Sequence, residues 1–93
     1  MENIRIHLWI YGKVQGVFFR ESAVTHARRL GVTGFVRNTY EGQVEIVFEG
    51  PKDKVEELAQ WCYEGSPHAK VEKIEEIKEQ YTGEFKDFRI AFE

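Results

Sequence analysis

The sequence has few cysteines and few prolines, and it has no long apolar run. Among its 93 residues are one cysteine (Cys62), two prolines and three histidines. A single cysteine excludes an internal disulfide, and three scattered histidines add too few ligands for a structural zinc site. We therefore expect a domain that is held together by side-chain packing alone, without a metal or a cofactor.

The apolar runs are far too short to cross a membrane. Gly16–Phe19 is one of them, whereas a spanning helix needs about 20 apolar residues. Met1–Arg5 lacks the apolar stretch of a secretory signal, so we expect a cytoplasmic protein without a membrane partner. The length predicts one domain over residues 1–93, because a domain usually has about 100–200 residues. We expect this domain to act as a monomer.

The charge of the chain is unevenly distributed. The net charge of −3 argues against a general nucleic-acid or membrane-surface binder. Residues 1–40 nevertheless carry six basic and two acidic side chains, and five of the six arginines lie there. The planar guanidinium suits phosphate or carboxylate, which indicates an anion site near the N-terminus.

The first part of the chain predicts a strand followed by a helix. Apolar residues alternate over residues 4–11, which is typical of a strand with one buried face. From Arg20 to Leu30 the apolar spacing changes to that of a helix, and Gly31 stands just beyond it as a C-terminal stop.

The middle of the chain predicts a hairpin and a second helix. Residues 33–38 and 43–49 alternate in polarity around a turn, with glutamates on the outer face of the second strand. Pro51 suits the first turn of the helix that follows, and Gly65 closes that helix. Its apolar stripe consists of Val55, Leu58, Ala59 and Cys62.

The last third is harder to interpret. Val71, Ile74 and Ile77 recur every three residues, which by itself favours a helix. The segment is short and its apolar residues are all β-branched, so we predict a strand over residues 71–78, either regular or with a bulge. A terminal strand is predicted from the alternation at Phe88–Phe92.

The predicted order is strand, helix, strand, strand, helix, strand, plus a terminal strand. This order predicts an α+β fold, a ferredoxin-like α/β sandwich in which an antiparallel sheet carries both helices on one face. Such a sheet has one buried face. The residues expected to form the core are Ile4, Ile6, Leu8, Ile10, Val44, Ile46 and Phe48 of the strands and Ala23, Ala27, Leu30, Val55, Leu58 and Cys62 of the helices.

Residues 12–20, GKVQGVFFR, join the first strand to the first helix. A helix N-terminus presents free N–H groups and partial positive charge, and glycines let the backbone approach a ligand. Arg20 in the first turn is disfavoured by about 0.3–1 kcal/mol through the helix dipole, and a bound anion reverses that effect. The alternative is a tight strand-to-helix turn with an exposed arginine.

Asn38 is the second candidate, because it ends the second predicted strand just before the turn. Asparagine is common in turns for conformational reasons alone. In this topology the first and third strands are neighbours, so Asn38 can come close to residues 15–20 and take part in a shared site.

Two segments resemble the signatures of the acylphosphatase family: GKVQGVFFR over residues 12–20 and GFVRNTYEGQVE over residues 34–45. The resemblance extends over essentially the whole chain. Its departures are small, with Phe35 where tryptophan is common and Tyr40 at a variable turn position. It implies a ferredoxin-like fold and supports a strand over residues 71–78.

The resemblance implies an enzyme, a metal-independent hydrolase that cleaves an acyl phosphate into a carboxylate and inorganic phosphate. Arg20 and the backbone amides of the loop are implied to bind the phosphate, and Asn38 to position the attacking water. The loop residues are Gln15, Gly16, Val17, Phe18 and Phe19.

Three other functions remain as alternatives. A non-catalytic ferredoxin-like module that binds a small anion for regulation needs Arg20 but has no use for Asn38. A domain detached from a larger maturation enzyme that handles carbamoyl phosphate usually brings cysteine-rich zinc segments, which are absent here. An RNA-binding sheet face is opposed by Glu45 and Glu49.

Two reactive residue types are set aside. His7 falls at an outward strand position, where a surface role is expected. Cys62 falls on the apolar stripe of the second helix and is expected to be a buried small hydrophobe.

Overall fold

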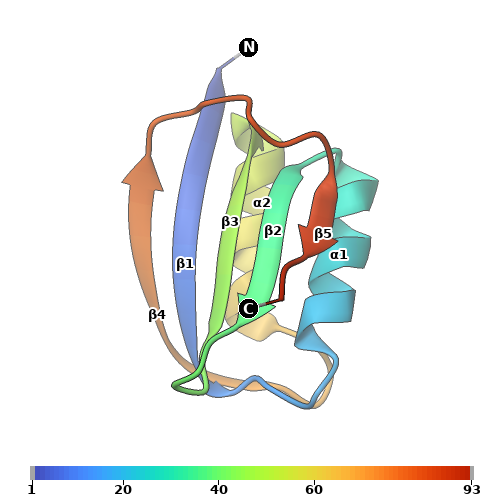
Figure 1. Cartoon of the computed structure of the whole chain (residues 1–93), viewed down its shortest axis with the longest axis vertical. Helices are drawn as coiled ribbons and strands as arrows, with labels where there is room; N and C mark the ends of the chain where they lie inside the picture. The colour runs from blue at the N-terminus through green and yellow to red at the C-terminus, as the bar shows by residue number, and fades with distance from the viewer. Residues whose placement is uncertain (1, 93) are drawn as a thin grey trace.

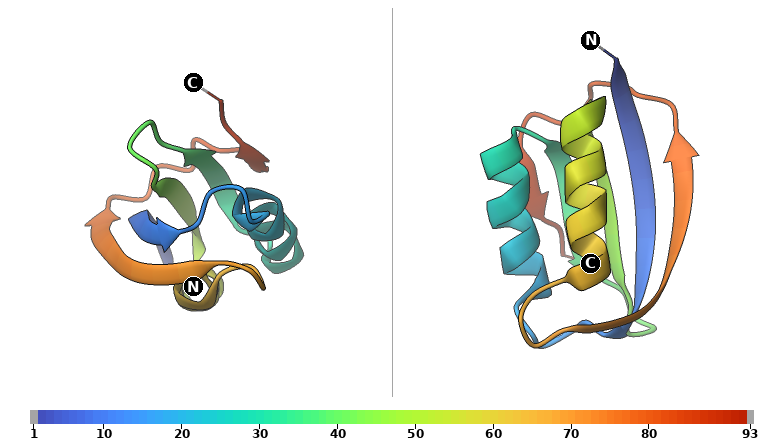
Figure 2. Two further views of the ribbon diagram at one scale, coloured as in Figure 1. Left: turned by 90° about the horizontal axis from the view of Figure 1, so that it is seen from below. Right: turned by 180° about the vertical axis from the view of Figure 1, so that it is seen from behind.

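Two helices cover one face of a five-stranded sheet (Figure 1; Figure 2, right). The computed structural model describes residues 2–92. The order of helices and strands agrees with the predicted one. In chain order the elements are β1 (Asn3–Lys13), α1 (Phe19–Leu30), β2 (Thr33–Asn38), β3 (Val44–Pro51), α2 (Lys52–Glu64), β4 (Lys70–Glu79) and β5 (Phe88–Ile90).

The strand order in the sheet is β4-β1-β3-β2-β5, and the predicted antiparallel arrangement holds for every pair except one. Strand β5 runs parallel to β2. The chain leaves β4 at the end of the sheet where β2 begins, crosses that end, and enters β5 in the direction of β2 (Figure 1). The sheet is therefore mixed, and the expectation of a wholly antiparallel sheet is wrong at this edge.

Strand β4 confirms the strand prediction for residues 71–78 and explains the spacing of Val71 and Ile74, whereas Ile77 is exposed. Tyr11 pairs with Lys73, whereas Gly12 pairs with Val71, so β4 has one extra residue at this point. The bulge brings Val71 and Ile74 onto the core side although they are three residues apart. Gly12 is required there, because a Cβ would lie 2.1 Å from the Lys70 carbonyl oxygen.

The core lies between the sheet and the two helices. All the predicted core residues are buried in it or packed against it. In the register of β1 with β3, Ile6 faces Phe48 and Leu8 faces Ile46, so the predicted apolar rows lie side by side. Each large aliphatic side chain buried in this way contributes roughly 1.5–3 kcal/mol. Within residues 2–92, neither helix is long and apolar enough to cross a membrane.

The outer face of the sheet is more buried than the alternation predicts. Glu49 is fully buried, and its carboxylate accepts hydrogen bonds from the backbone N–H groups of Thr82 and Gly83 at 3.2 and 2.7 Å. The β4–β5 connection therefore covers one end of this face. An expectation of one buried face misses this cover, because it comes from a segment without a periodic pattern.

Two element boundaries differ from the prediction. Strand β5 ends at Ile90, and the Phe92 side chain is exposed rather than part of a buried row. Pro51 is the last residue of β3 and the N-cap of α2, with a ψ of 136°, so it precedes the first helical turn.

Candidate active site

The chain between β1 and α1, the β1–α1 loop (residues 14–18), is held at several points. Val14 and Val17 are buried. The buried Ser66 hydroxyl donates a hydrogen bond of 2.7 Å to the Val17 carbonyl oxygen. Phe19, which begins α1, is buried so closely against Gly65 that a Cβ there would lie 2.8 Å from its ring. These contacts fix the loop to the α2–β4 connection.

The backbone of the loop reverses direction at Phe18. Among residues 2–92, Phe18 is the only non-glycine residue with a positive φ, at φ 63° and ψ 25°. A bulky residue in this left-handed region costs about 1–3 kcal/mol. The Phe18 side chain is 71% exposed, so burial does not compensate for this cost. Strain of this kind is typical of functional sites.

The reversal leaves the start of α1 without a cap. Phe18 is the N-cap residue and makes no side-chain capping bond. The first backbone bond of the helix runs from the Ser22 N–H to the Phe18 carbonyl oxygen. The N–H groups of Phe19, Arg20 and Glu21 precede that bond and have no partner within the helix. They form a set of donors at the positive end of the helix dipole, which suits an anion.

Arg20 adds a full charge to these donors. Its guanidinium forms no ion pair or hydrogen bond with residues 2–92 and lies 5.9 Å from the centre of the exposed Phe92 ring. Arg5, by contrast, is paired with Glu49, Glu79 and Glu84. Arg20 is therefore free to pair with a ligand.

A hollow of about 160 Å³ opens at the start of α1. A hollow of this size has room for a small anion. It is lined by Val14, Gly16, Phe18, Phe19, Arg20 and Glu21. Gly16 has a φ of 76° and open space where a Cβ would stand, so its backbone conformation, not crowding, requires glycine.

Asn38 ends β2, opposite Val44 of β3. Its side-chain oxygen Oδ1 is buried and accepts no hydrogen bond from residues 2–92. Leaving a buried acceptor unpaired costs about 1–3 kcal/mol, and such groups often take part in ligand or water binding. Asn38 is therefore prepared to accept a hydrogen bond from a molecule other than the protein.

The β1–α1 loop and the turn that follows Asn38, the β2–β3 turn (residues 39–43), lie at the same end of the sheet (Figure 1, bottom; Figure 2, left). The Gln15 side chain joins them. Its Nε2 donates hydrogen bonds of 2.9 and 2.8 Å to the carbonyl oxygens of Thr39 and Gln43.

The structure thus brings the predicted site residues to one end of the molecule, but their side chains serve different purposes. Gly16, Phe18, Phe19 and Arg20 line the hollow, whereas Gln15, Val17 and Asn38 do not. Val17 is an anchor in the core, and Gln15 points to the β2–β3 turn.

Sequence reasoning missed two residues that hold the site in place. Gln15 is predicted to act only through its backbone amide, although its side chain bridges the β1–α1 loop and the β2–β3 turn. Ser66 is missed because nothing in its local pattern reveals a contact 49 residues away. A polar residue directly after a helix-ending glycine is the one available signal for Ser66.

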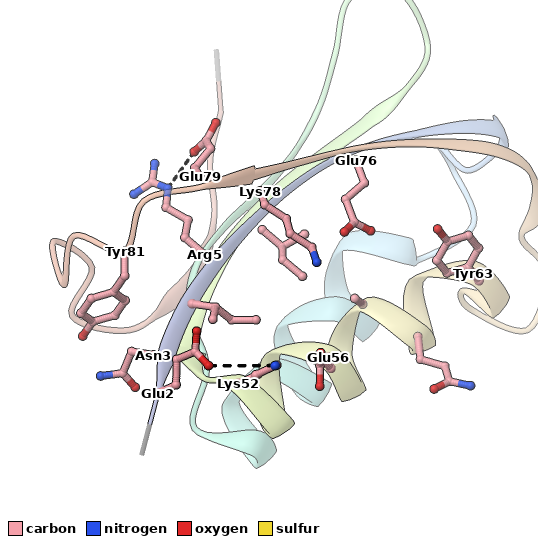
Figure 3. Close-up of a pocket in the computed structure, with 14 residues that line it drawn as sticks. Glu2, Asn3, Arg5, Lys52, Glu56, Tyr63, Glu76, Lys78, Glu79 and Tyr81 are labelled. Carbon is pink, nitrogen blue, oxygen red and sulfur yellow. Dashed lines mark hydrogen bonds and ion pairs between the residues drawn. The ribbon is translucent and has the colours of Figure 1, made fainter.

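A larger hollow, of about 690 Å³, lies between α2 and β4 (Figure 3). Four of the charged groups on its wall form pairs: Arg5 with Glu79 at 2.8 Å, and Lys52 with Glu2 at 4.0 Å. Its remaining cation, Lys78, has no ion pair within residues 2–92, but four carboxylates (Glu2, Glu56, Glu76 and Glu79) line the same hollow and disfavour an anion there.

The outer face of the sheet carries a second group of charges. His7 lies between Glu79 and Glu45, with its two ring nitrogens 2.8 and 2.6 Å from their carboxylate oxygens. The expected plain surface role of His7 is therefore wrong. The two nitrogens face opposite carboxylates, and within residues 2–92 no group of histidine, cysteine or acidic residues is arranged to hold a metal.

Cys62 is fully buried, as predicted, and burial raises the pKa of its thiol far above the ordinary value. A thiol that stays protonated is a poor nucleophile.

A sequence model of the acylphosphatase family matches residues 6–90, which include both the β1–α1 loop and Asn38. The chain belongs to the acylphosphatase family. Hydrolysis of acyl phosphates is the known function of this family, and this chain is an acylphosphatase-type hydrolase. The family's small-molecule substrate agrees with the size of the hollow at α1.

Relatives and solved structures agree with this assignment. An acylphosphatase of Pyrobaculum islandicum is 55% identical over 91 residues, which are 97% of this chain and 96% of the relative. The structure of an acylphosphatase from Coxiella burnetii has a TM-score of 0.89 and 39% identity, over 96% of this chain and 93% of the other. That of Bacillus subtilis has a TM-score of 0.91 and 29% identity, over 96% and 99%.

Proposed function

We propose that the free donors at the start of α1 bind the phosphoryl group of an acyl phosphate and that Asn38 positions the water that attacks it. The observation that carries this proposal is the guanidinium of Arg20, which has no ion pair within residues 2–92 and stands in the first helical turn with three backbone N–H groups that lack a partner within the helix. Arginine can bind two phosphate oxygens in a bidentate manner.

The reaction requires little beyond this arrangement. The water oxygen forms a bond to phosphorus while the bond from phosphorus to the bridging oxygen breaks, and the acyl group leaves as a carboxylate with the electron pair. The protons of the water pass to the phosphate product and the solvent. Because a carboxylate is a good leaving group, positioning and stabilisation of charge on the phosphoryl oxygens are sufficient.

Asn38 supplies the direction of attack. Its unpaired Oδ1 accepts a hydrogen bond from an O–H group of the water. This bond orients a lone pair of the water oxygen toward phosphorus. The carboxamide has no charge to repel the phosphoryl group. The same role explains why the buried acceptor is left without a partner in the protein.

The test is the decay of benzoyl phosphate with purified protein, in buffer with and without a chelator. We expect hydrolysis well above the spontaneous rate and unchanged by chelator. Asn38→Ala should lower turnover by about 10²–10³-fold, as does loss of one transition-state donor, while inorganic phosphate still binds. Asn3→Ala, at the start of β1, is the matched control and should leave turnover unchanged.

Three outcomes contradict the proposal. Near-normal turnover in Asn38→Ala excludes its role with water, and sensitivity to chelator excludes a metal-independent mechanism. If the wild type binds phosphate but leaves the decay rate at background, the chain is a binding module instead.

We also propose that the protein works as a monomer in the cytoplasm and as one domain over residues 1–93. Support for the monomer comes from the site, because every group assigned to it belongs to one chain. Support for the cytoplasm comes from the single cysteine, which is buried and unpaired.

A further inference from the structure

The connection between the two halves of the site depends on one side chain. The donors for phosphate lie at the β1–α1 loop and the start of α1, whereas Asn38 lies at the end of β2. Among residues 2–92, the only hydrogen bonds between the β1–α1 loop and the β2–β3 turn are the two from Gln15 Nε2.

Both N–H groups of the Gln15 carboxamide are used in this link. The two atoms that Nε2 approaches are carbonyl oxygens, at 2.9 and 2.8 Å, and neither can donate. The nitrogen end of the carboxamide must therefore face the turn, because the oxygen end would meet two acceptors. A residue of the same shape without donors cannot form this link.

The two acceptors belong to the pair of residues that closes the turn. The Thr39 N–H donates to the Gln43 carbonyl oxygen at 2.9 Å, and the Gln43 N–H donates to the Thr39 hydroxyl at 3.1 Å. Gln15 thus binds the β2–β3 turn at its closing pair, directly after Asn38. Any movement of this pair relative to the loop also moves the backbone that carries Asn38.

We infer that Gln15 is a positioning residue, which fixes the Asn38 carboxamide relative to the bound phosphoryl group and acts on the reaction through Asn38. This inference rests on the proposed function. It assigns Gln15 a role in turnover rather than in phosphate affinity, because its side chain is committed to the turn and does not line the hollow.

The test compares Gln15→Met, which keeps the shape and removes the donors, with the wild type. We expect turnover to fall by about 10–100-fold, because a shift of about 1 Å in a reacting group has effects of this size. The affinity for inorganic phosphate should change less than about threefold. Gln60→Met, on the exposed face of α2, is the matched control.

A role through Asn38 has a signature that simple destabilisation lacks. In the Asn38→Ala background, Gln15→Met should change turnover by less than about twofold, because the group that it positions is gone. A second variant, Gln15→Glu, has the same shape but directs a carboxylate at two carbonyl oxygens, so it should lose at least as much turnover as Gln15→Met.

Three results overturn the inference. They are undiminished turnover in Gln15→Met, a loss of turnover from Gln15→Met that is as large in the Asn38→Ala background as in the wild type, and a loss confined to phosphate affinity. NMR provides a readout independent of activity. The Gln15 side-chain N–H protons should exchange slowly with solvent and show coupling to the Thr39 and Gln43 carbonyl carbons. If wild-type protein is inactive, the proposed function fails; if these couplings are absent, the link itself fails.

Discussion

Phe18 has a left-handed backbone conformation that a phenylalanine disfavours. Its left-handed backbone opens the start of α1, and its exposed side chain gains little from burial. At ordinary helical positions glycine is less stable than alanine by roughly 0.5–1 kcal/mol. At Phe18 the order should be reversed, because only alanine keeps the strain of a positive φ.

We therefore predict that Phe18→Gly has a free energy of unfolding about 1 kcal/mol higher than Phe18→Ala. Urea unfolding of the two variants measures this difference. Thr25→Gly and Thr25→Ala, at an exposed position within α1, are the control pair and should show the ordinary order. If alanine is also better at position 18, the backbone there is not left-handed in solution.

At the scale of single residues the sequence already indicates much of the site. The type and spacing of residues 12–20 point to an anion loop, and Arg20 and Asn38 are identified by their positions at element ends. The orientation of Gln15 is not predictable in this way, because its partners are backbone carbonyls 24 and 28 residues away. Only the fold reveals which side chain connects the two segments.

At the scale of elements, β1 is joined to both of its neighbours by side chains as well as by its backbone. On the outer face, His7 bridges Glu45 of β3 and Glu79 of β4 and stacks on Trp9 at 3.8 Å. Both ring nitrogens can donate together only in the charged imidazolium form. The hydrogen bond from His7, with a smaller contribution from Arg5, lowers the pKa of Glu79.

This lowered pKa predicts how stability depends on pH. The unfolded chain takes up a proton at Glu79 near the ordinary pKa of 4.5, before the folded protein does. The contribution of Glu79 is therefore complete above this pH and is lost as the pH falls below it. Urea unfolding between about pH 6 and about pH 3 should show a shallower loss of stability in Glu79→Gln than in the wild type.

Glu72→Gln, at an exposed position of the same strand, is the control and should follow the wild-type profile. Profiles of equal slope in the wild type and Glu79→Gln would mean that the bridge from His7 to β4 does not form in solution.

The faces of the first three strands could be predicted from the sequence, but the direction of β5 and the cover over Glu49 could not. The alternation of apolar residues in β1, β2 and β3 correctly predicts which face of each strand is directed to the core, because that face packs against the helices. The direction of β5 depends on the path of residues 80–87 across one end of the sheet, and the cover over Glu49 comes from the same segment. That segment has no apolar period, so its course is not encoded in a local pattern.

At the scale of the whole molecule, the fold separates stability from chemistry. On the outer face His7 pairs with Glu79, and in the groove between α2 and β4 Arg5 pairs with Glu79 and Lys52 with Glu2 (Figure 3). The start of α1, which carries Arg20, and the end of β2, which carries Asn38, lie toward the opposite end of the molecule, beside the β1–α1 loop and the β2–β3 turn (Figure 1). The proposed anion site is thus separate from the charged pairs that contribute to the structure.

The central claim is that the start of α1 binds phosphate through Arg20 and the backbone amides, and a titration with inorganic phosphate followed by NMR of the backbone amides tests it most directly. We expect the largest shifts at residues 16–21, and Arg20→Ala should abolish both this binding and turnover. Arg29→Ala, on the same helix, should bind as the wild type does. Shifts that gather instead in the groove between α2 and β4, or that persist in Arg20→Ala, would contradict the account.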